Sequence, residues 1–210
     1  MADKKKVLIL ADINSIHTQK WVKSLMCDFD IFLCSIDPIT EITHEIEEIV
    51  SFVKFYTSQK RLSNSSNKLL FLKFYLQLIR IKKSFKPDII HSHYATSYGL
   101  LGRLLFFKRF YISVWGSDIF EFPLKSTLHR IIIRFILQGA ATLFSTSKTM
   151  LFFLCLHGRL SQATAFPIPA SPSYAMQPPC PRHTSPQPRS LLSPYSYCCV
   201  FLHRTFFYKL

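Results

Sequence analysis

Two short segments, Pro87–Tyr94 (PDIIHSHY) and Tyr111–Asp118 (YISVWGSD), decide the fold class of this chain. Each is an apolar run that changes abruptly to polar residues at its end. Such a run is typical of a strand buried on both faces of a parallel sheet, with the polar residues at its carboxyl end. Ligands of these sheets bind beyond the carboxyl ends of the strands. The two segments therefore predict an α/β sheet with a ligand site at one edge.

Strand-like and helix-like segments alternate through residues 5–150, which predicts a doubly wound, parallel, Rossmann-like sheet. The expected strands are Val7–Ala11, Asp30–Ile36, Ile49–Tyr56, Asp88–Ser92, Phe110–Val114 and Ala141–Ser145. The expected helices are Thr18–Met26, Asn67–Ser84, Ser97–Phe107 and Thr127–Gln138, with Glu41–Glu48 a short helix or a loop. Ser126 and Gly139 are the expected caps of the last helix.

The composition changes after Met150. All 12 acidic residues lie at or before Glu121, whereas nine of the 12 prolines lie within residues 151–210. Proline is excluded from central strands and from helix interiors, so no regular domain is expected there. We interpret 151–210 as an irregular, Pro-rich tail that is either disordered or the out-of-register product of a frameshift. A genuine but unusual tail is the alternative.

The chain carries a net charge of +14, which favours anionic partners such as phosphates and anionic lipid headgroups. A basic protein with no such partner is the alternative. No zinc-finger spacing and no aromatic RNA-binding strand is present, so nucleic acid is not expected as a partner. The basic stretch Lys60–Lys86 is a candidate for peripheral contact with an anionic membrane; a solvated helix face is the other interpretation.

The charged start Met1–Lys6 is followed by an apolar run too short for a signal-peptide core. No uncharged run reaches the length that spans a bilayer. We therefore expect a cytoplasmic protein, with a peripheral position at the inner face of the plasma membrane as a further expectation.

The loop after the first strand contains no glycine, which weighs against a nicotinamide-binding site. It does place Asn14, Ser15, His17 and Thr18 at the expected start of a helix. Free N–H groups and the helix dipole at such a position suit a phosphate or a sugar hydroxyl. Ordinary capping by Ser15 or Thr18 is the alternative.

Two histidines close the strand of the first segment. We expect His91 and His93 to point to opposite faces of the strand, which weighs against a two-histidine metal site. No cluster of cysteines or acids supports a metal either, and none is expected. His91 is the more structural of the two, whereas His93, followed by Tyr94, lies at a polar strand end and is the candidate for function.

Gly116, Ser117 and Asp118 end the second segment in the same way. Gly116 allows a ligand or backbone to come close. Asp118 is a candidate to accept a proton from a hydroxyl nucleophile or to orient it. An Asx-turn or a helix cap is the structural interpretation of this carboxylate.

These residues resemble the N-terminal domain of the retaining, two-Rossmann-domain (GT-B) glycosyltransferases of family 4 (group 1). The matching stretches are KVLILADINSIHTQKWVKSL, KPDIIHSHYATSYGLLGRL, YISVWGSDIF and ATLFSTSKTM. The resemblance implies retaining transfer of a sugar from a nucleotide-sugar donor to a glycan or lipid-linked acceptor, in bacterial cell-surface polysaccharide synthesis. The donor would be a substrate, and no cofactor or metal is implied, because protein cations and helix ends stabilise the diphosphate.

The resemblance also implies roles for individual residues. His93 would lie near the transferred sugar, and Asp118 would line the same cleft as the second catalytic candidate. The expected substrate contacts are Asn14, Ser15, His17, Thr18, Tyr94, Gly116 and Ser117.

One departure from the family is large. The second domain of these enzymes carries a pair of glutamates, but here no acidic residue follows Glu121. We therefore expect the donor-binding domain to be missing and the truncated chain to be inactive. The alternative is a non-catalytic Rossmann-like binding module or a membrane-peripheral remnant.

Overall fold

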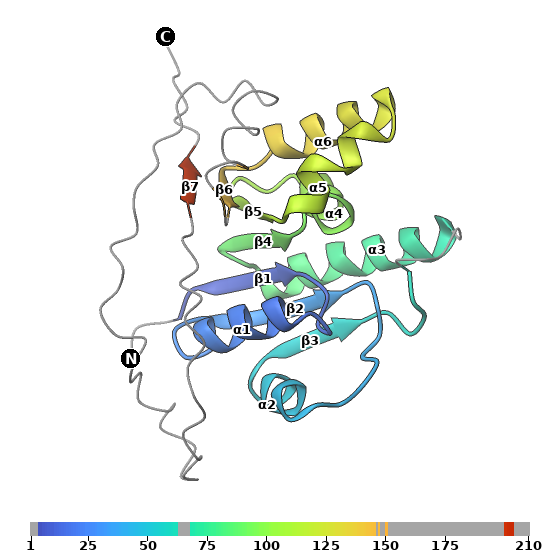
Figure 1. Cartoon of the computed structure of the whole chain (residues 1–210). Helices are drawn as coiled ribbons and strands as arrows, with labels where there is room; N and C mark the ends of the chain where they lie inside the picture. Colours follow the sequence, from blue (N-terminus) through green and yellow to red (C-terminus); the bar gives the residue numbers. More distant parts are fainter. Residues whose placement is uncertain (1–3, 63–67, 146, 148–149, 151–199, 204–210) are drawn as a thin grey trace.

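The computed structural model describes residues 4–62, 68–145, 147, 150 and 200–203. In this part of the chain seven strands form one sheet in the order β3-β2-β1-β4-β5-β6-β7 (Figure 1). The first six are parallel, and β7 pairs with β6 in the antiparallel sense. The strands are β1 (Lys6–Leu10), β2 (Asp30–Ser35), β3 (Lys54–Thr57), β4 (Ile89–His93), β5 (Phe110–Val114), β6 (Thr142–Ser145) and β7 (Val200–His203).

Helices cover both faces of the sheet, which confirms the doubly wound Rossmann-like fold. Helices α1 and α2 lie on one face, and α3, α4 and α6 lie on the other (Figure 1). The helices are α1 (Ile16–Leu25), α2 (His44–Phe52), α3 (Lys68–Phe85), α4 (Ser97–Leu104), α5 (Gly116–Phe120), the 3-10 turn η1 (Phe122–Leu124) and α6 (Thr127–Gln138).

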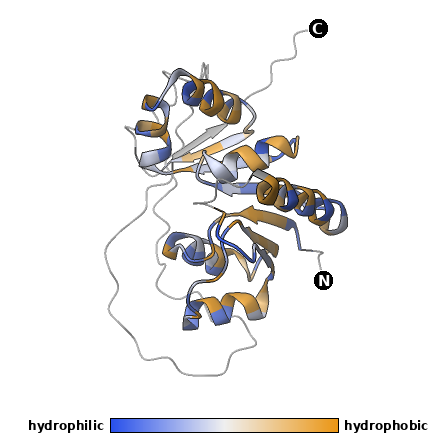
Figure 2. Cartoon of the chain, turned by 90° about the vertical axis from the view of Figure 1, so that its right-hand side faces the viewer, coloured by the Kyte–Doolittle hydropathy of each residue, from blue (hydrophilic) through white to orange (hydrophobic). Residues whose placement is uncertain are grey.

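The apolar runs supply two hydrophobic cores, one on each face. In β1, Leu8 and Leu10 belong to the core under α3, α4 and α6, whereas Val7 and Ile9 belong to the core under α1 and α2. Alternate residues of a strand face opposite ways, so a strand buried on both faces must be apolar throughout. The hydropathy colouring shows orange segments in strands near the middle of the sheet, and both orange and blue segments in the helices (Figure 2).

Helix α6 begins and ends where its caps predict. The Ser126 side chain accepts a hydrogen bond from the backbone N–H of His129, and Gly139 is the C-cap. A side-chain carbon on Gly139 would lie 2.0 Å from Cδ of Arg103, so glycine here also makes room for α4.

The prediction of a strand at Ile49–Tyr56 is wrong over the first half of that range. Helix α2 extends to Phe52, and only Lys54–Thr57 is a strand. Thr43 caps α2 by accepting from the N–H of Ile46, and Ile46 and Ile49 are buried on one face three residues apart. Capping and this helical spacing prevail over the β-branched residues that suggested a strand.

The helix expected at Ser97–Phe107 ends earlier, at Leu104. Phe106 adopts a left-handed conformation with φ of 48°, which cannot continue a right-handed helix. Most of the expected tail, and with it the frameshift hypothesis, lies outside the described residues. Its described part, Val200–His203, adds an edge strand beside β6.

Candidate functional site

The strand order reverses between β1 and β4, because β2 and β3 follow on one side of β1 and β5 and β6 follow on the other side of β4. In parallel sheets, ligands bind beyond the carboxyl ends of the strands at such a point. The loop from β1 to α1 and the residues after β4 and β5 meet at this edge. These are the segments that the sequence singled out.

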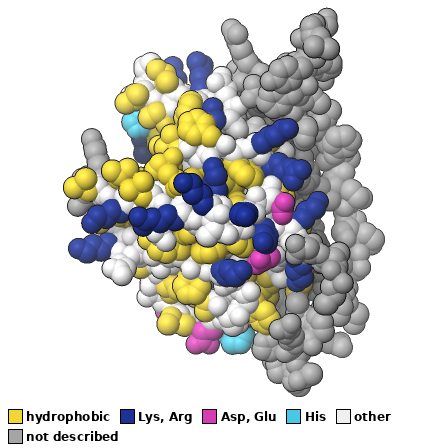
Figure 3. Space-filling view, turned by 180° about the vertical axis from the view of Figure 1, so that it is seen from behind, with side chains coloured by type: hydrophobic (Ala, Val, Ile, Leu, Met, Phe, Trp, Pro, Cys, Tyr) yellow, Lys and Arg dark blue, Asp and Glu magenta, His cyan; other side chains and the backbone are white. Residues whose placement is uncertain are grey.

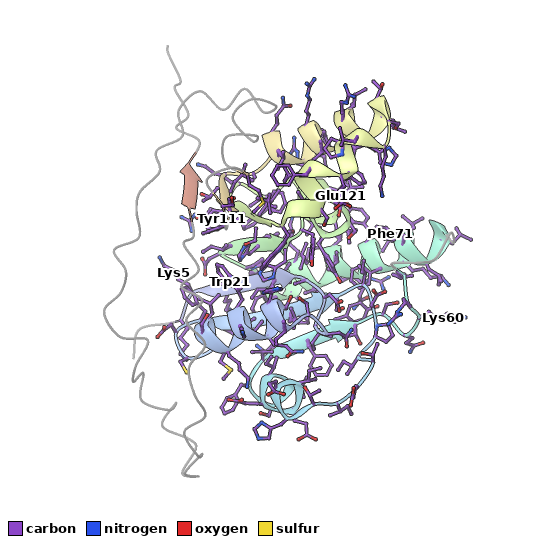
Figure 4. The ribbon with its side chains drawn as sticks, viewed as in Figure 1. Lys5, Trp21, Lys60, Phe71, Tyr111 and Glu121 are labelled. Atoms are coloured by element: carbon purple, nitrogen blue, oxygen red, sulfur yellow. The ribbon has the colours of Figure 1, made fainter. Side chains whose placement is uncertain are left out.

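His91 and His93 point to the same face of β4, and the expectation that they would diverge is wrong. Their ring centroids are 4.9 Å apart, and Trp21 of α1 packs edge-on against both, at 5.2 Å and 5.6 Å. Figure 4 shows Trp21 projecting from α1 toward the strands. Side chains change face at every residue of a strand, so residues two apart share a face. No group of three or more potential metal-binding side chains is found in the described residues.

His91 is part of the packed interior. Its Nε2 lies 2.9 Å from the hydroxyl of Ser113 on β5, and its ring packs against Phe144 at 5.2 Å. Burial lowers the pKa of His91 to about 4, so its ring is neutral near pH 7. His91 therefore joins β4, β5 and β6 and carries no charge.

His93 is buried but has an unused ring nitrogen. Only 1% of the residue is exposed, and Nδ1 lies 3.4 Å from the hydroxyl of Thr18 on α1. Its Nε2 has no hydrogen-bond partner in the described part of the chain. Burial lowers the pKa of His93 well below its ordinary value, and the nearby His91 and His17 lower it further. The neutral ring has one nitrogen still available for hydrogen bonding.

Asp118 joins the two strand ends. Its carboxylate accepts hydrogen bonds from the backbone N–H of Ala95, at 2.7 Å, and of Trp115, at 2.9 Å. Burial raises the pKa of Asp118 to about 7, although these hydrogen bonds oppose the shift. Tyr94, next to Ala95, has a left-handed backbone with φ of 69°, a conformation that side chains rarely adopt. Asp118 thus holds an unfavourable turn after β4 against the end of β5.

Of the four expected residues in the loop after β1 and at the start of α1, His17 and Thr18 contact the residues at the ends of β4 and β5, whereas Asn14 does not. Asn14 turns toward the β2 side, where its side chain donates to the carbonyl of Pro38 and accepts from Thr40. Ser15 is the N-cap of α1 but makes no side-chain capping bond. Thr18 is buried against His93, and the ring of His17 lies 4.5 Å from that of Trp115.

The remaining expected residues begin α5. A side-chain carbon added at Gly116 would make an ordinary van der Waals contact of 3.7 Å with the Phe120 ring, and Ser117 is exposed. Trp115, just before them, is a site residue that the sequence reasoning missed. Its ring lies 6.3 Å from His93 and 6.0 Å from Tyr94. The available signal was an aromatic residue at the very end of an apolar strand.

A sequence model of the family described as glycosyl transferase 4-like matches residues 6–147. The chain belongs to this family. The match to the glycosyl transferase 4-like family covers β1 to β6 and every site residue named above.

Among solved structures, the chain is similar to a crystal structure of UDP-N-acetylglucosamine 2-epimerase, with a TM-score of 0.51 and 14% sequence identity. The similarity covers 73% of this chain and 45% of the epimerase chain, so the chain spans less than half of that protein. At this identity the likeness shows the fold alone. The search of curated proteins found no match.

Proposed function

We propose that this glycosyl transferase 4-like domain descends from an enzyme that transfers a sugar, with retention, from a nucleotide-sugar donor to a glycan or lipid-linked acceptor. Cell-surface polysaccharide synthesis in bacteria is the proposed setting. The observation that carries the proposal is the buried, neutral His93, whose free Nε2 lies at the strand-order reversal within the family match. Such a nitrogen suits a hydrogen bond with a sugar hydroxyl.

Within this proposal the two catalytic candidates act differently. His93 contacts the sugar, whereas Asp118 acts through the backbone, because its oxygens hold the N–H groups of Ala95 and Trp115. Substrate contacts are proposed for seven residues: Asn14, Ser15, His17, Thr18, Tyr94, Gly116 and Ser117.

We further propose that the 210-residue polypeptide, assayed alone, binds an acceptor without turnover. The lack of any acidic residue after Glu121 supports this, because a glutamate pair cannot be supplied by that part of the sequence. Incubation with UDP- and GDP-sugars and a lipid-linked acceptor should release no nucleoside diphosphate above a His93→Ala control.

If the chain releases nucleoside diphosphate and His93→Ala abolishes this release, the proposed inactivity is contradicted. The anomeric configuration of the product would then test retention. If turnover is absent, direct binding decides between the remaining alternatives. Saturable binding of a glycan acceptor supports the binding-module form of the proposal. A chain that binds neither donor nor acceptor would overturn the proposed role.

Peripheral membrane contact is proposed for α3, within Lys60–Lys86. Leu69, Leu72 and Leu76 are 68%, 52% and 47% exposed, and Lys73 and Arg80 are exposed beside them. Seen from behind, dark-blue basic and yellow apolar side chains are interspersed over the molecule with few magenta acids (Figure 3). Basic groups near anionic lipid are worth about 1 kcal/mol each. No helix in the described ranges is long and apolar enough to cross a bilayer.

Vesicle sedimentation tests this contact. The chain should bind vesicles rich in phosphatidylglycerol and not neutral phosphatidylcholine vesicles, and salt should weaken the binding. The double substitution Leu72→Asp and Leu76→Asp should abolish it, whereas Leu128→Asp with Ile131→Asp, on an exposed part of α6, is the matched control. Equal binding to both vesicle types, or equal loss in the control, would contradict the proposal.

A further inference from the structure

Two buried side-chain nitrogens lack a hydrogen-bond partner within the described residues: Nε2 of His93 and Nε1 of Trp115. Proteins satisfy nearly all of their buried polar groups. An unsatisfied one costs about 1–3 kcal/mol of stability. Their occurrence on neighbouring residues at the strand-order reversal requires an explanation beyond packing.

The two rings are held in place by different parts of the structure. Thr18 contacts the other nitrogen of His93, and the backbone N–H of Trp115 donates to Asp118. The ring centroids are 6.3 Å apart. Tyr94, in its left-handed turn, lies 6.0 Å from the indole on the adjoining strand end. Backbone strain of this kind persists where the surroundings fix it and is frequent at ligand sites.

The chemistry of the two nitrogens restricts the group that could satisfy them. An indole N–H can only donate, so its partner must be an acceptor. A neutral histidine has one donor and one acceptor nitrogen. Nε2 of His93 is the acceptor if Nδ1 donates its proton to the Thr18 hydroxyl, and the donor if Nδ1 accepts from that hydroxyl. A hydroxyl has two lone pairs and one proton and therefore fits both tautomers.

A phosphate fits less well. Its charged oxygens are acceptors, and it gains most from a positively charged partner. Burial keeps the pKa of His93 well below its ordinary value, so this ring supplies no positive charge near pH 7. The Trp115 ring lies beside the rings of His17, His93 and Tyr94. A neutral, hydroxyl-bearing ligand is the better match.

We infer that Trp115 is a ligand-binding residue, whose Nε1–H donates to a hydroxyl of a neutral carbohydrate within reach of His93 Nε2. The choice of carbohydrate among hydroxyl compounds rests on the proposed function. Both nitrogens are buried, so a side chain must move to admit the ligand. His17, half-buried and 4.5 Å from the indole, is the one we expect to move.

Indole nitrogen labelling tests this directly. The chain has two tryptophans, Trp21 and Trp115, so the full chain should give two indole N–H resonances, assigned with the Trp21→Phe and Trp115→Phe variants. The probes are methyl glycosides of glucose, galactose, mannose and N-acetylglucosamine, and inorganic phosphate at matched ionic strength. A methyl glycoside should move the Trp115 indole proton saturably, and phosphate should not.

A response to phosphate alone would replace the carbohydrate with an anion and overturn the inference. A response confined to Trp21, or no response with any of the glycosides, would also overturn it. The readout needs no turnover, so an inactive chain with a responding indole separates failure of catalysis from failure of this site.

The Trp115→Phe variant keeps an aromatic ring and removes only the N–H donor. Calorimetry should show the responding glycoside binding on the order of tenfold more weakly, as expected for one lost hydrogen bond. Lys23→Met, on the outside of α1 where Lys23 pairs with Glu48, should bind within about twofold of the parent chain. If Trp115→Phe fails to fold by circular dichroism, the indole shift in the Trp21→Phe chain still decides the question.

Discussion

Strands β4 and β5 have two faces with opposite characters. On the face under α3, α4 and α6, Ile90, Ile112 and Val114 are buried in an apolar core. Ser92 is buried on the same face, where its hydroxyl donates to the carbonyl of Tyr98. On the face toward α1, the alternate residues His91, His93 and Ser113 are similarly buried but polar, and their side chains make hydrogen bonds with one another or with Thr18. The same two strands thus stabilise the domain with the side chains of one face and contribute polar side chains to the candidate site with the other.

The largest effect should come from the apolar face. Ile112→Ala should lower the free energy of unfolding by about 2–5 kcal/mol, because it removes a fully buried side chain and leaves a cavity. Ser113→Ala, the adjacent residue on the other face, should cost about 1–2 kcal/mol through the lost bond to His91. Urea denaturation monitored by circular dichroism measures both. Equal losses would show that the two faces contribute alike.

The polar face should make stability depend on pH. Burial lowers the pKa of His91 to about 4, below the value of about 6.5 for an unfolded chain. Between these values the unfolded state binds the proton and the folded state does not, so stability falls as the pH falls. The loss should reach about 3 kcal/mol near pH 4.

Comparison with His91→Gln measures this contribution, together with the smaller effect of His91 on the pKa of His93, because glutamine does not titrate. Asp118, whose pKa burial raises to about 7, acts in the opposite direction and is common to both chains. Unfolding free energies measured from pH 8 to pH 4 should converge for the two chains at low pH. Parallel curves would show that His91 is not buried in its neutral form.

A pair of glycines tests the same contrast at the level of single carbon atoms. A side-chain carbon on Gly102, behind the apolar face, would lie 2.3 Å from the Phe110 ring, whereas one on Gly116 would meet nothing within 3.7 Å. Gly102→Ala should therefore destabilise by about 1–3 kcal/mol. Gly116→Ala should be nearly neutral. Thermal unfolding of the two variants provides the comparison, and a destabilised Gly116→Ala alone would reverse it.

The smallest effect should come from the surface. Lys23 of α1 lies 2.6 Å from Glu48 of α2 across the outside of the second core. Both side chains are partly exposed, and solvent screens such pairs, so Lys23→Met should cost less than about 1 kcal/mol. The cost should shrink further in 0.5 M salt. A larger, salt-independent loss would assign the effect to packing between α1 and α2.

The fold was largely predictable from the sequence because buried parallel strands have a simple signature. The runs that became β1 and β5 are mostly apolar and are followed by polar residues, and β4 begins with Ile89 and Ile90 before its histidines, so their type and edge were clear. The prediction of a strand at Ile49–Tyr56 was wrong because β-branched and aromatic residues favour a strand. The helical signal was the spacing of the buried residues Ile46 and Ile49, and Ile46 lies before the region that was considered.

The site was less predictable, for two different reasons. The shared face of His91 and His93 follows from their spacing of two and needed no coordinates. The contacts of Thr18 with His93 and of His17 with Trp115 instead join α1 to strand ends about 75 and 98 residues away, a pairing fixed only by the sheet order. No local pattern could have revealed those pairs.

The position of β1 has a consequence for biosynthesis. β1 is central in the sheet, yet one of its neighbours is β4, and the Lys6 N–H donates to the Asp88 carboxylate 82 residues later. At about 5–20 residues per second, a ribosome needs roughly 4–16 s to supply that partner after β1 emerges. During this interval the apolar strand has an open edge, the form of nascent chain that chaperones protect from aggregation.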